Sequence, residues 1–250
     1  METSDSNQPG IFASAFQFWR DIAVRRGYIQ ASRELLVTLW EFARDSTPAR
    51  LRQRFGDADY DWDYRVNTTS GAVGWRDRLL GALHTLYQPT EPSLFHEMLA
   101  ALREHTKSDL ADFTFIDLGS GKGRTLLMAS DYPFRRIIGV ELLPRLHQVA
   151  LQNISQYRAD SQKCFAMESV CADASTFPLP GGPLVIYLFN PLLESPLRHT
   201  FANVAASLRQ NPRPIYVLYH NPQLERIFDE MGELRKISGT YQYSLFAATH

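Results

Sequence analysis

The chain has little cysteine, no surplus of charge of either sign, and no long run of apolar residues. Two cysteines, Cys164 and Cys171, are too few for a disulfide framework or a four-ligand zinc site, and they are predicted to be buried or half-buried thiols. Lys and Arg number 26 against 27 Asp and Glu, a formal net charge of −1. This balance argues against a dedicated duplex-binding protein, so there is no strong nucleic-acid signal.

Membrane and export signals are also missing from the sequence. No stretch reaches the roughly 18 apolar residues that cross a bilayer, and the longest candidate, Leu184 to Leu193, is broken by Asn190 and Pro191. The polar, acidic start METSDSNQPG has no basic region followed by an apolar run, so it is not a signal peptide. We therefore expect a soluble, cytoplasmic protein without a membrane span.

Several common catalytic arrangements are absent from the sequence as well. It contains no pattern typical of a Ser-His-Asp triad, a glycosidase carboxylate pair or a metal cluster, and its seven histidines include no His-x-x-x-His pair. His220 ends an apolar run and can face a substrate, but we interpret it as a structural histidine.

The first part of the chain has a helical pattern from Ile11 to about Phe55, with bulky apolar residues at helical spacing. Such helices can lie on a membrane surface, but their basic residues are nearly matched by acidic ones, which favours a helical layer packed on the main domain. Residues Gly56 to Trp75 are acidic and aromatic and show no helical period, which indicates a functional loop or a linker. A helix is expected from Ser93 to about His105.

From Phe113 onward, apolar runs alternate with helical patterns. Alternation of this length predicts a doubly wound α/β sheet with helices on both faces. The last two runs surround a Gly-Thr turn and predict a terminal antiparallel hairpin. The predicted strands lie in the segments 113–119, 135–141, 165–173, 183–190 and 213–221, and the hairpin in 234–249.

A glycine-rich turn follows the first of these strands, in the segment Asp117-Leu118-Gly119-Ser120-Gly121-Lys122-Gly123-Arg124. The glycine spacing differs from the G-x-G-x-x-G of dinucleotide-binding proteins, and Gly-Lys is not followed by Ser or Thr as a P-loop requires. Asp117 would repel a pyrophosphate but would suit a ligand that carries an ammonium group. Lys122 and Arg124 are predicted to be exposed residues of the first helical turn.

This pattern resembles the first motif of the class I S-adenosylmethionine-dependent methyltransferases. The resemblance implies a Rossmann-like sheet and S-adenosyl-L-methionine as cofactor. It also implies cofactor contacts from the residues of the turn: Asp117, Gly119, Ser120, Gly121 and Gly123.

Three further positions match the family in order. Glu141 ends the second predicted strand 24 residues after Asp117, where such enzymes hold the cofactor ribose with a carboxylate. Asp173 follows the third strand and matches the acid that contacts the adenine amine, although a helix cap is an alternative role. Asn190 ends the fourth strand in Phe-Asn-Pro-Leu, which resembles the N/D-P-P-Y/F motif of amino-group methyltransferases without its second proline and aromatic residue. Asn190 is thus predicted to contact the cofactor and to be catalytic, unless it only terminates the strand.

The chain is more closely similar to a group of bacterial class I methyltransferases, and distantly to histone-lysine methyltransferases of the Dot1 type. In both, a segment like Tyr87-Gln88-Pro89-Thr90-Glu91-Pro92 precedes the core and folds over the cofactor, which implies cofactor contacts from Tyr87 and Thr90. The predicted division is an N-terminal helical extension and lid, residues 1–86, and an S-adenosylmethionine-binding methyltransferase domain, residues 87–250.

The sequence therefore predicts a methyltransferase whose acceptor atom is a nitrogen of a protein side chain or a small molecule. The acceptor itself is not identified, and RNA stays open beside proteins and metabolites. One alternative is a non-catalytic S-adenosylmethionine-binding or interaction protein. A nicotinamide-dependent oxidoreductase is a second alternative, disfavoured by the glycine spacing and by Asp117.

Overall fold

The computed structural model describes residues 58–68, 89–106, 108–189 and 194–249, together with single helical positions between residues 16 and 36. The chain divides into two compact units: Met1–Ala58 with Thr69–Gln88, and Asp59–Thr68 with Pro89–His250. In the first unit the described positions are helical, and Trp19 stacks between Phe16 and Tyr28. Tyr87 and Asn190 lie outside the described residues, as does most of the predicted extension.

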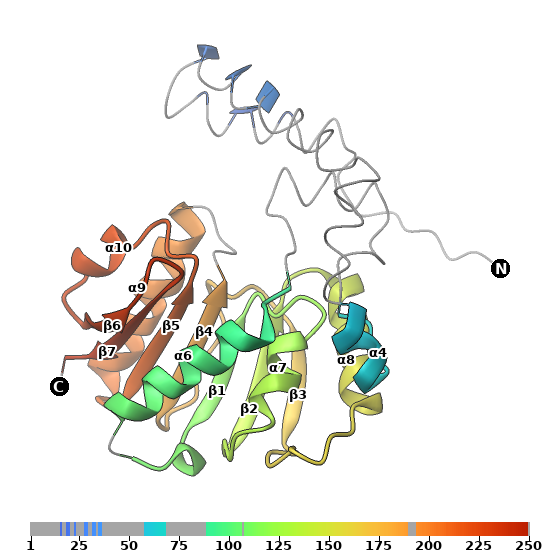
Figure 1. Ribbon diagram of the computed structural model, residues 1–250. Coiled ribbons are helices and arrows are strands. Elements are labelled where there is room, and N and C mark those ends of the chain that lie inside the picture. The colour runs from blue at the N-terminus through green and yellow to red at the C-terminus, as the bar shows by residue number, and fades with distance from the viewer. Residues whose placement is uncertain are drawn as a thin grey trace. The chain divides into compact units, whose positions relative to one another are not determined.

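The second unit is built on one seven-stranded sheet with the strand order β3-β2-β1-β4-β5-β7-β6 (Figure 1). Five strands run parallel, and β7 is antiparallel to both of its neighbours. The strands are β1 (Thr114–Leu118), β2 (Arg136–Glu141), β3 (Met167–Cys171), β4 (Leu184–Phe189), β5 (Ile215–His220), β6 (Leu234–Gly239) and β7 (Tyr243–Ala248). The predicted Rossmann-like sheet, its parallel pairing of the first and fourth strands and its terminal hairpin are confirmed.

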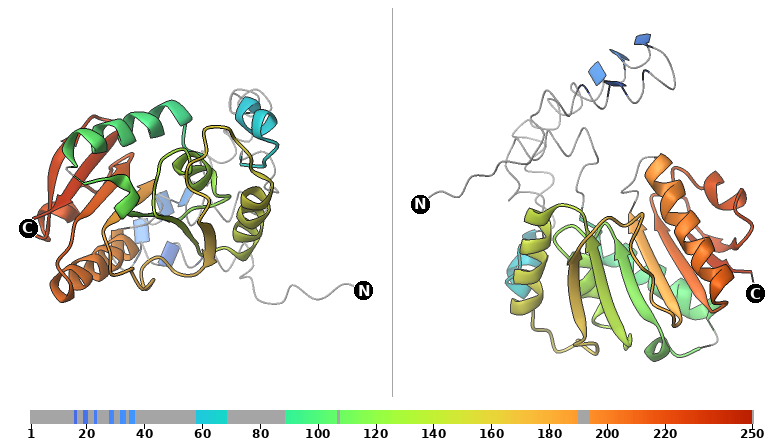
Figure 2. Two further views of the ribbon diagram at one scale, coloured as in Figure 1. Left: turned by 90° about the horizontal axis from the view of Figure 1, so that it is seen from below. Right: turned by 180° about the vertical axis from the view of Figure 1, so that it is seen from behind.

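Helices cover both faces of this sheet. Apolar residues of α6 (Pro92–His105) and α7 (Arg124–Ala129) form one core with β1 and β4, and Ile154 of α8 (Pro144–Gln156) packs against it. The opposite core joins α9 (Glu194–Gln210) and α10 (Arg226–Asp229) to the same sheet, and α9 lies in front of the strands in the view from behind (Figure 2). A 3₁₀ helix, η3 (Leu110–Asp112), precedes β1.

The central strand β1 is buried along its whole length, as a parallel strand between two helical layers requires. Because parallel strands end at a common edge, Leu118, Glu141 and Phe189 finish β1, β2 and β4 on the same side. The order reverses between β1 and β4, and a Rossmann-like sheet binds its ligands at such a switch point. The glycine turn after β1 lies at this position.

Two sequence predictions about local structure are wrong. Residues 58–64 form a helix, α4 (Ala58–Tyr64), inside the stretch predicted to have no helical period. Tyr60 and Tyr64 are one turn apart with their ring centroids 4.8 Å apart, and the Tyr64 ring lies 5.3 Å from that of Tyr157, so tertiary packing stabilises this short helix. Cys164 is buried as predicted, but Cys171 at the end of β3 is exposed.

Among the described residues, no helix combines the length and the apolar character needed to cross a membrane.

Candidate functional site

The glycine turn joins β1 to α7 through three left-handed residues. Gly119, Gly121 and Gly123 have φ angles of 92°, 54° and 83°, a region that side-chain-bearing residues rarely adopt. The amides of Gly119 and Ser120 both donate to the Val140 carbonyl, at 2.8 and 3.1 Å, so the turn is tied to the end of β2. The three predicted glycines therefore have a conformational reason to be glycine.

The buried carboxylate of Asp117 lies on β1 immediately before this turn. The residue is 3 % exposed, and the Thr125 hydroxyl on α7 donates to its Oδ2. Burial raises the pKa of Asp117 to about 7; the Thr125 hydrogen bond opposes this shift and the nearby Glu141 adds to it. Close to neutral pH, the protonated and the ionised forms of Asp117 are therefore both populated.

Glu141 connects the end of β2 to the glycine turn. Its Oε2 accepts a 2.8 Å hydrogen bond from the Gly121 amide, and its Oε1 accepts one of 2.8 Å from the Leu143 amide. Burial raises the pKa of Glu141, while these backbone donors lower it. A carboxylate can accept about four hydrogen bonds, so both oxygens keep acceptor capacity for a ligand.

The turn also packs closely against β2 at Gly139. A Cβ atom added to Gly139 would lie 2.6 Å from Leu126 Cδ1 and 2.7 Å from Ser120 Oγ. Ser120 itself is 5 % exposed, and its buried hydroxyl makes no hydrogen bond among the described residues. Glycine at 139 is therefore needed for Ser120 and Leu126 to occupy their positions.

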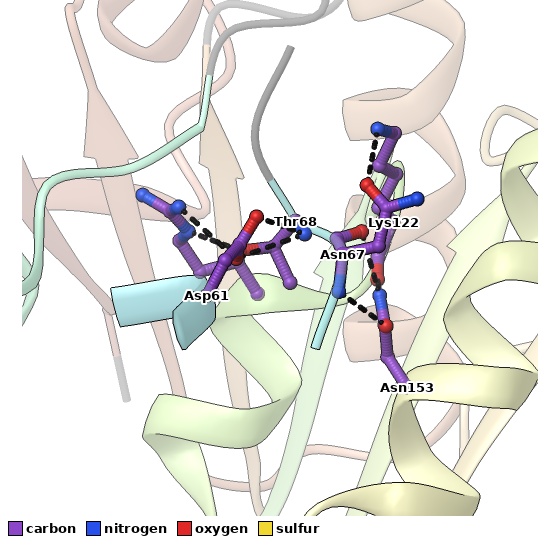
Figure 3. Close-up of polar contacts among 6 residues, drawn as sticks. Asp61, Asn67, Thr68, Lys122 and Asn153 are labelled. Atoms are coloured by element: carbon purple, nitrogen blue, oxygen red, sulfur yellow. Dashed lines mark hydrogen bonds and ion pairs between the residues drawn. The ribbon is translucent and has the colours of Figure 1, made fainter. Parts of the chain in front are cut away.

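Lys122 and Arg124 are buried, so the prediction that they are exposed is wrong. They are only 1 % and 2 % exposed because residues far away in sequence cover them (Figure 3). Arg124 donates from Nε to Thr68 Oγ1 at 2.7 Å, and its Nη2 lies 3.6 Å from Asp61 Oδ1. Lys122 Nζ donates to Asn67 Oδ1 at 3.0 Å, and burial lowers the pKa of Lys122 to about 8 against the opposing effect of Asp61.

Asn153 on α8 completes this contact. Its Oδ1 accepts from the Asn67 amide at 2.8 Å, and its Nδ2 donates to the carbonyls of Asn67 and Lys122 at 2.9 and 2.8 Å (Figure 3). One side-chain amide thus satisfies the backbone of residue 67 and holds it against the glycine turn. We call the five residues Asp61, Asn67, Thr68, Arg124 and Asn153 the turn anchor.

The turn anchor was not foreseen from the sequence. Asp61, Asn67 and Thr68 stand in a stretch without a motif, and Asn153 is one polar residue of an amphipathic helix. The sequence contains only one indirect sign of these contacts: two cationic residues stand in a turn that the fold buries.

The other predicted site residues differ in their surroundings. Thr90 is 3 % exposed, and its Oγ1 lies 2.7 Å from the Tyr187 hydroxyl of β4. Asp173 is exposed after β3, where its Oδ1 accepts from the amide and hydroxyl of Ser175 at 2.8 and 2.7 Å. This is the capping arrangement considered beside an adenine contact. The contact itself stays a prediction, as do the roles of Tyr87 and Asn190.

Comparison with known proteins gives matches in structure only. No protein-family model and no curated protein sequence matches the chain. A predicted N6-adenine-specific DNA methylase from Listeria monocytogenes is 17 % identical, with a TM-score of 0.47 over 64 % of this chain and 51 % of its own. The chain thus spans about half the length of that protein.

Two further solved structures are similar to the chain. A precorrin-6y C5,15-methyltransferase from Geobacter metallireducens is 16 % identical, with a TM-score of 0.47 over 76 % of this chain and 95 % of its own. An RNA methyltransferase from Salinibacter ruber, in complex with S-adenosyl-L-homocysteine, is 18 % identical, with a TM-score of 0.39 over 64 % of this chain and 92 % of its own. Our assignment of the fold rests on the strand order.

We expect Gly139→Ala to destabilise the unit by about 1–3 kcal/mol, because the added methyl group overpacks a buried contact. It should also weaken binding at the glycine turn, since Ser120 must shift. Gly182→Ala is the matched control, because a Cβ at Gly182 meets no atom within 4 Å. Urea unfolding of both variants measures the difference, and equal stabilities would contradict the close packing of the turn against β2.

We expect Asp61→Ala to destabilise the protein by about 3–5 kcal/mol, because it removes a carboxylate that lies 3.6 Å from the buried Arg124 guanidinium. The control is Glu168→Ala, which removes the ion pair with Arg136 between half-exposed side chains and should cost under about 1 kcal/mol. Chemical denaturation compares the two. A loss for Asp61→Ala no larger than that for Glu168→Ala would show that the turn anchor contributes little.

Proposed function

We propose that the protein is an S-adenosylmethionine-dependent methyltransferase. The observation that carries this proposal is the buried carboxylate of Asp117 directly before a left-handed glycine turn, with the Glu141 carboxylate beside it at the end of the next strand. Two acidic side chains at this edge of the sheet disfavour a ligand that places phosphates here. They favour a ligand with a cationic group and a diol.

The residues present fit this cofactor. Asp117 would hold the ammonium group, whose positive charge favours the ionised carboxylate and so lowers the raised pKa. Glu141 would accept hydrogen bonds from the ribose hydroxyls while the amides of Gly121 and Leu143 keep its carboxylate in place. The glycines leave backbone without side chains where the cofactor approaches.

When bound, S-adenosylmethionine supplies a methyl group that its sulfonium already activates. The protein then has to position the acceptor, and such positioning can lower the activation barrier by roughly 7–11 kcal/mol. Asn190, which follows β4 directly, is our proposed residue for orienting an acceptor nitrogen through its side-chain oxygen. An alkylamine acceptor must be neutral when it attacks, at a cost of about 4–5 kcal/mol at pH 7 unless desolvation lowers its pKa.

The remaining cofactor contacts are part of the same proposal. Ser120 is in the turn, Thr90 is buried beside β4, and Tyr87 and Asp173 complete the set. The division into a lid, residues 1–86, and a methyltransferase domain, residues 87–250, is likewise proposed. Residues 59–68 of that lid belong to the compact unit that contains the glycine turn.

We expect cofactor affinity to depend on pH through Asp117. Below pH 7 the ligand-free protein holds Asp117 mostly protonated, so binding of an ammonium group must release a proton. Affinity should therefore rise with pH up to about 7, by at most tenfold per pH unit, and fall again above about 8 as a free α-amino group loses its proton. Calorimetric titration with S-adenosylmethionine at pH 6, 7 and 8 measures this.

Asp117→Asn should bind weakly and lose the pH dependence between 6 and 7, whereas Asp112→Asn, at an exposed acid, should behave like the wild type. NAD should not bind to any of these proteins. Tight cofactor binding by Asp117→Asn at pH 8 would exclude Asp117 as the partner of the ammonium group.

We expect Glu141→Ala to weaken cofactor binding about 30–150-fold, which corresponds to roughly 2–3 kcal/mol of lost charge-assisted hydrogen bonds. Glu141→Gln should lose less, because its carbonyl oxygen still accepts from one of the amides that hold Glu141. Titration with S-adenosylhomocysteine measures both variants. A change of less than threefold for Glu141→Ala would mean that this carboxylate does not hold the ribose.

A further inference from the structure

Three buried side chains form a continuous hydrogen-bond chain at the carboxyl edge of the sheet. Thr90 Oγ1 lies 2.7 Å from the Tyr187 hydroxyl, which lies 2.9 Å from Nδ1 of His220. The residues come from the segment before α6, from β4 and from the last position of β5, and they are 3 %, 1 % and 8 % exposed. Neither the glycine turn nor the turn anchor includes any of them.

The imidazole of His220 is held firmly in this position. Phe189 stacks on it with ring centroids 3.8 Å apart and planes inclined by 10°. The His220 backbone pairs with Phe189 of β4 on one side and Tyr243 of β7 on the other, so the residue belongs to the sheet interior. Its ring therefore has one covered face and one bonded nitrogen.

The hydrogen-bond chain selects one tautomer of the ring. A phenol hydroxyl is the stronger donor and an imidazole nitrogen the stronger acceptor, so Tyr187 donates to Nδ1 and Thr90 donates to the Tyr187 oxygen. The nitrogen bonded in this way carries no proton, which puts the ring proton on Nε2. Burial lowers the pKa of His220 to about 4, so the ring is neutral at cellular pH.

The Nε2–H group is the hydrogen-bond donor of this ring that can bind a ligand. It makes no hydrogen bond to the described residues, and it is not one of their buried unpaired atoms, so this nitrogen is accessible from outside the sheet. A histidine with a purely structural role commonly uses both of its nitrogens. The position is one strand from the switch point and adjacent to the end of β4, where the proposed function puts the methyl acceptor.

We propose that His220 is a specificity-determining residue that donates from Nε2–H to a lone-pair atom of the methyl acceptor. This inference rests on the proposed function. It specifies an acceptor molecule with a carbonyl oxygen or ring nitrogen beside the atom that is methylated. A simple alkylamine has no such atom, so it is not the preferred substrate. Tyr187 is a positioning residue, because it acts through the imidazole, and Thr90, a proposed cofactor contact, also orients the Tyr187 hydroxyl.

The first test reads the tautomer directly. Long-range ¹H–¹⁵N spectra of the full chain at pH 7 should show His220 neutral, with its proton on Nε2, and the signal is assigned by its loss in His220→Gln. Tyr187→Phe should give a mixture of tautomers, because Nδ1 loses its donor. A His220 ring that carries its proton on Nδ1 in the wild type would overturn the proposal.

The second test uses two amides that imitate different ring nitrogens. The Gln side chain puts an N–H donor near the position of Nε2, whereas the shorter Asn side chain reaches only the position of Nδ1. Tritiated S-adenosylmethionine is supplied with three fractions of a bacterial lysate: deproteinised RNA, soluble protein and small molecules. In the accepting fraction, we expect His220→Asn to lose roughly tenfold in transfer rate and His220→Gln to keep most of it.

The controls separate this role from others. Both variants should bind S-adenosylhomocysteine within threefold of the wild type and unfold at similar temperatures. His96→Asn is the matched control, because His96 Nδ1 lies 2.8 Å from the Tyr132 hydroxyl in another tyrosine–histidine pair, on α6. It should leave transfer unchanged.

The outcomes distinguish the two proposals. Better transfer by His220→Asn than by His220→Gln would mean that only the Tyr187 contact matters, and it would overturn the role of Nε2. A loss of cofactor affinity equal to the loss of transfer would place His220 against the cofactor instead. A wild-type protein that does not bind S-adenosylmethionine, or binds it without transfer to any fraction, would overturn the proposed function itself.

Discussion

The burial of one carboxylate at the centre of the sheet is the constraint around which the site is arranged. Asp117 is on the central strand β1, where burial disfavours its charge, and among the described residues its hydrogen-bond partner is the Thr125 hydroxyl. Since its pKa is raised in the folded state, the free energy of unfolding of the ligand-free protein decreases as the pH rises towards 7 and then levels off. A residue chosen for stability alone would be apolar here, and the proposed cationic ligand gives a reason for the acid.

The glycine turn depends on contacts from three directions. Glu141 holds its Gly121 amide from β2, and Asn153 holds its Lys122 carbonyl from α8. The third direction is the segment 60–68, through Arg124 and Thr68. Because these contacts fix the backbone before any ligand arrives, less ordering is needed when a ligand binds.

The sequence predicts the strands and helices of this fold well, because buried parallel strands and amphipathic helices have recognisable local sequence patterns. It also predicts the turn, since left-handed backbone restricts residue choice at Gly119 and Gly123. The burial of Lys122 and Arg124 could not be predicted, because their partners precede them by more than fifty residues in a stretch without a pattern. The hydrogen bonds of Tyr187 could not be predicted for another reason. Within a continuous apolar run, a tyrosine indicates only a strand residue.

The position of β7 has a consequence for the order of assembly. The strand lies between β5 and β6, although it follows both in the chain, so β6 joins the sheet only through β7. During synthesis on the ribosome, the edge of β5 that pairs with β7 therefore stays without its partner until β7 emerges. That edge includes the backbone beside His220, which pairs with Tyr243 only then. A nascent chain that stalls before this point exposes a sheet edge that can pair with other chains, and the β6–β7 hairpin covers that edge.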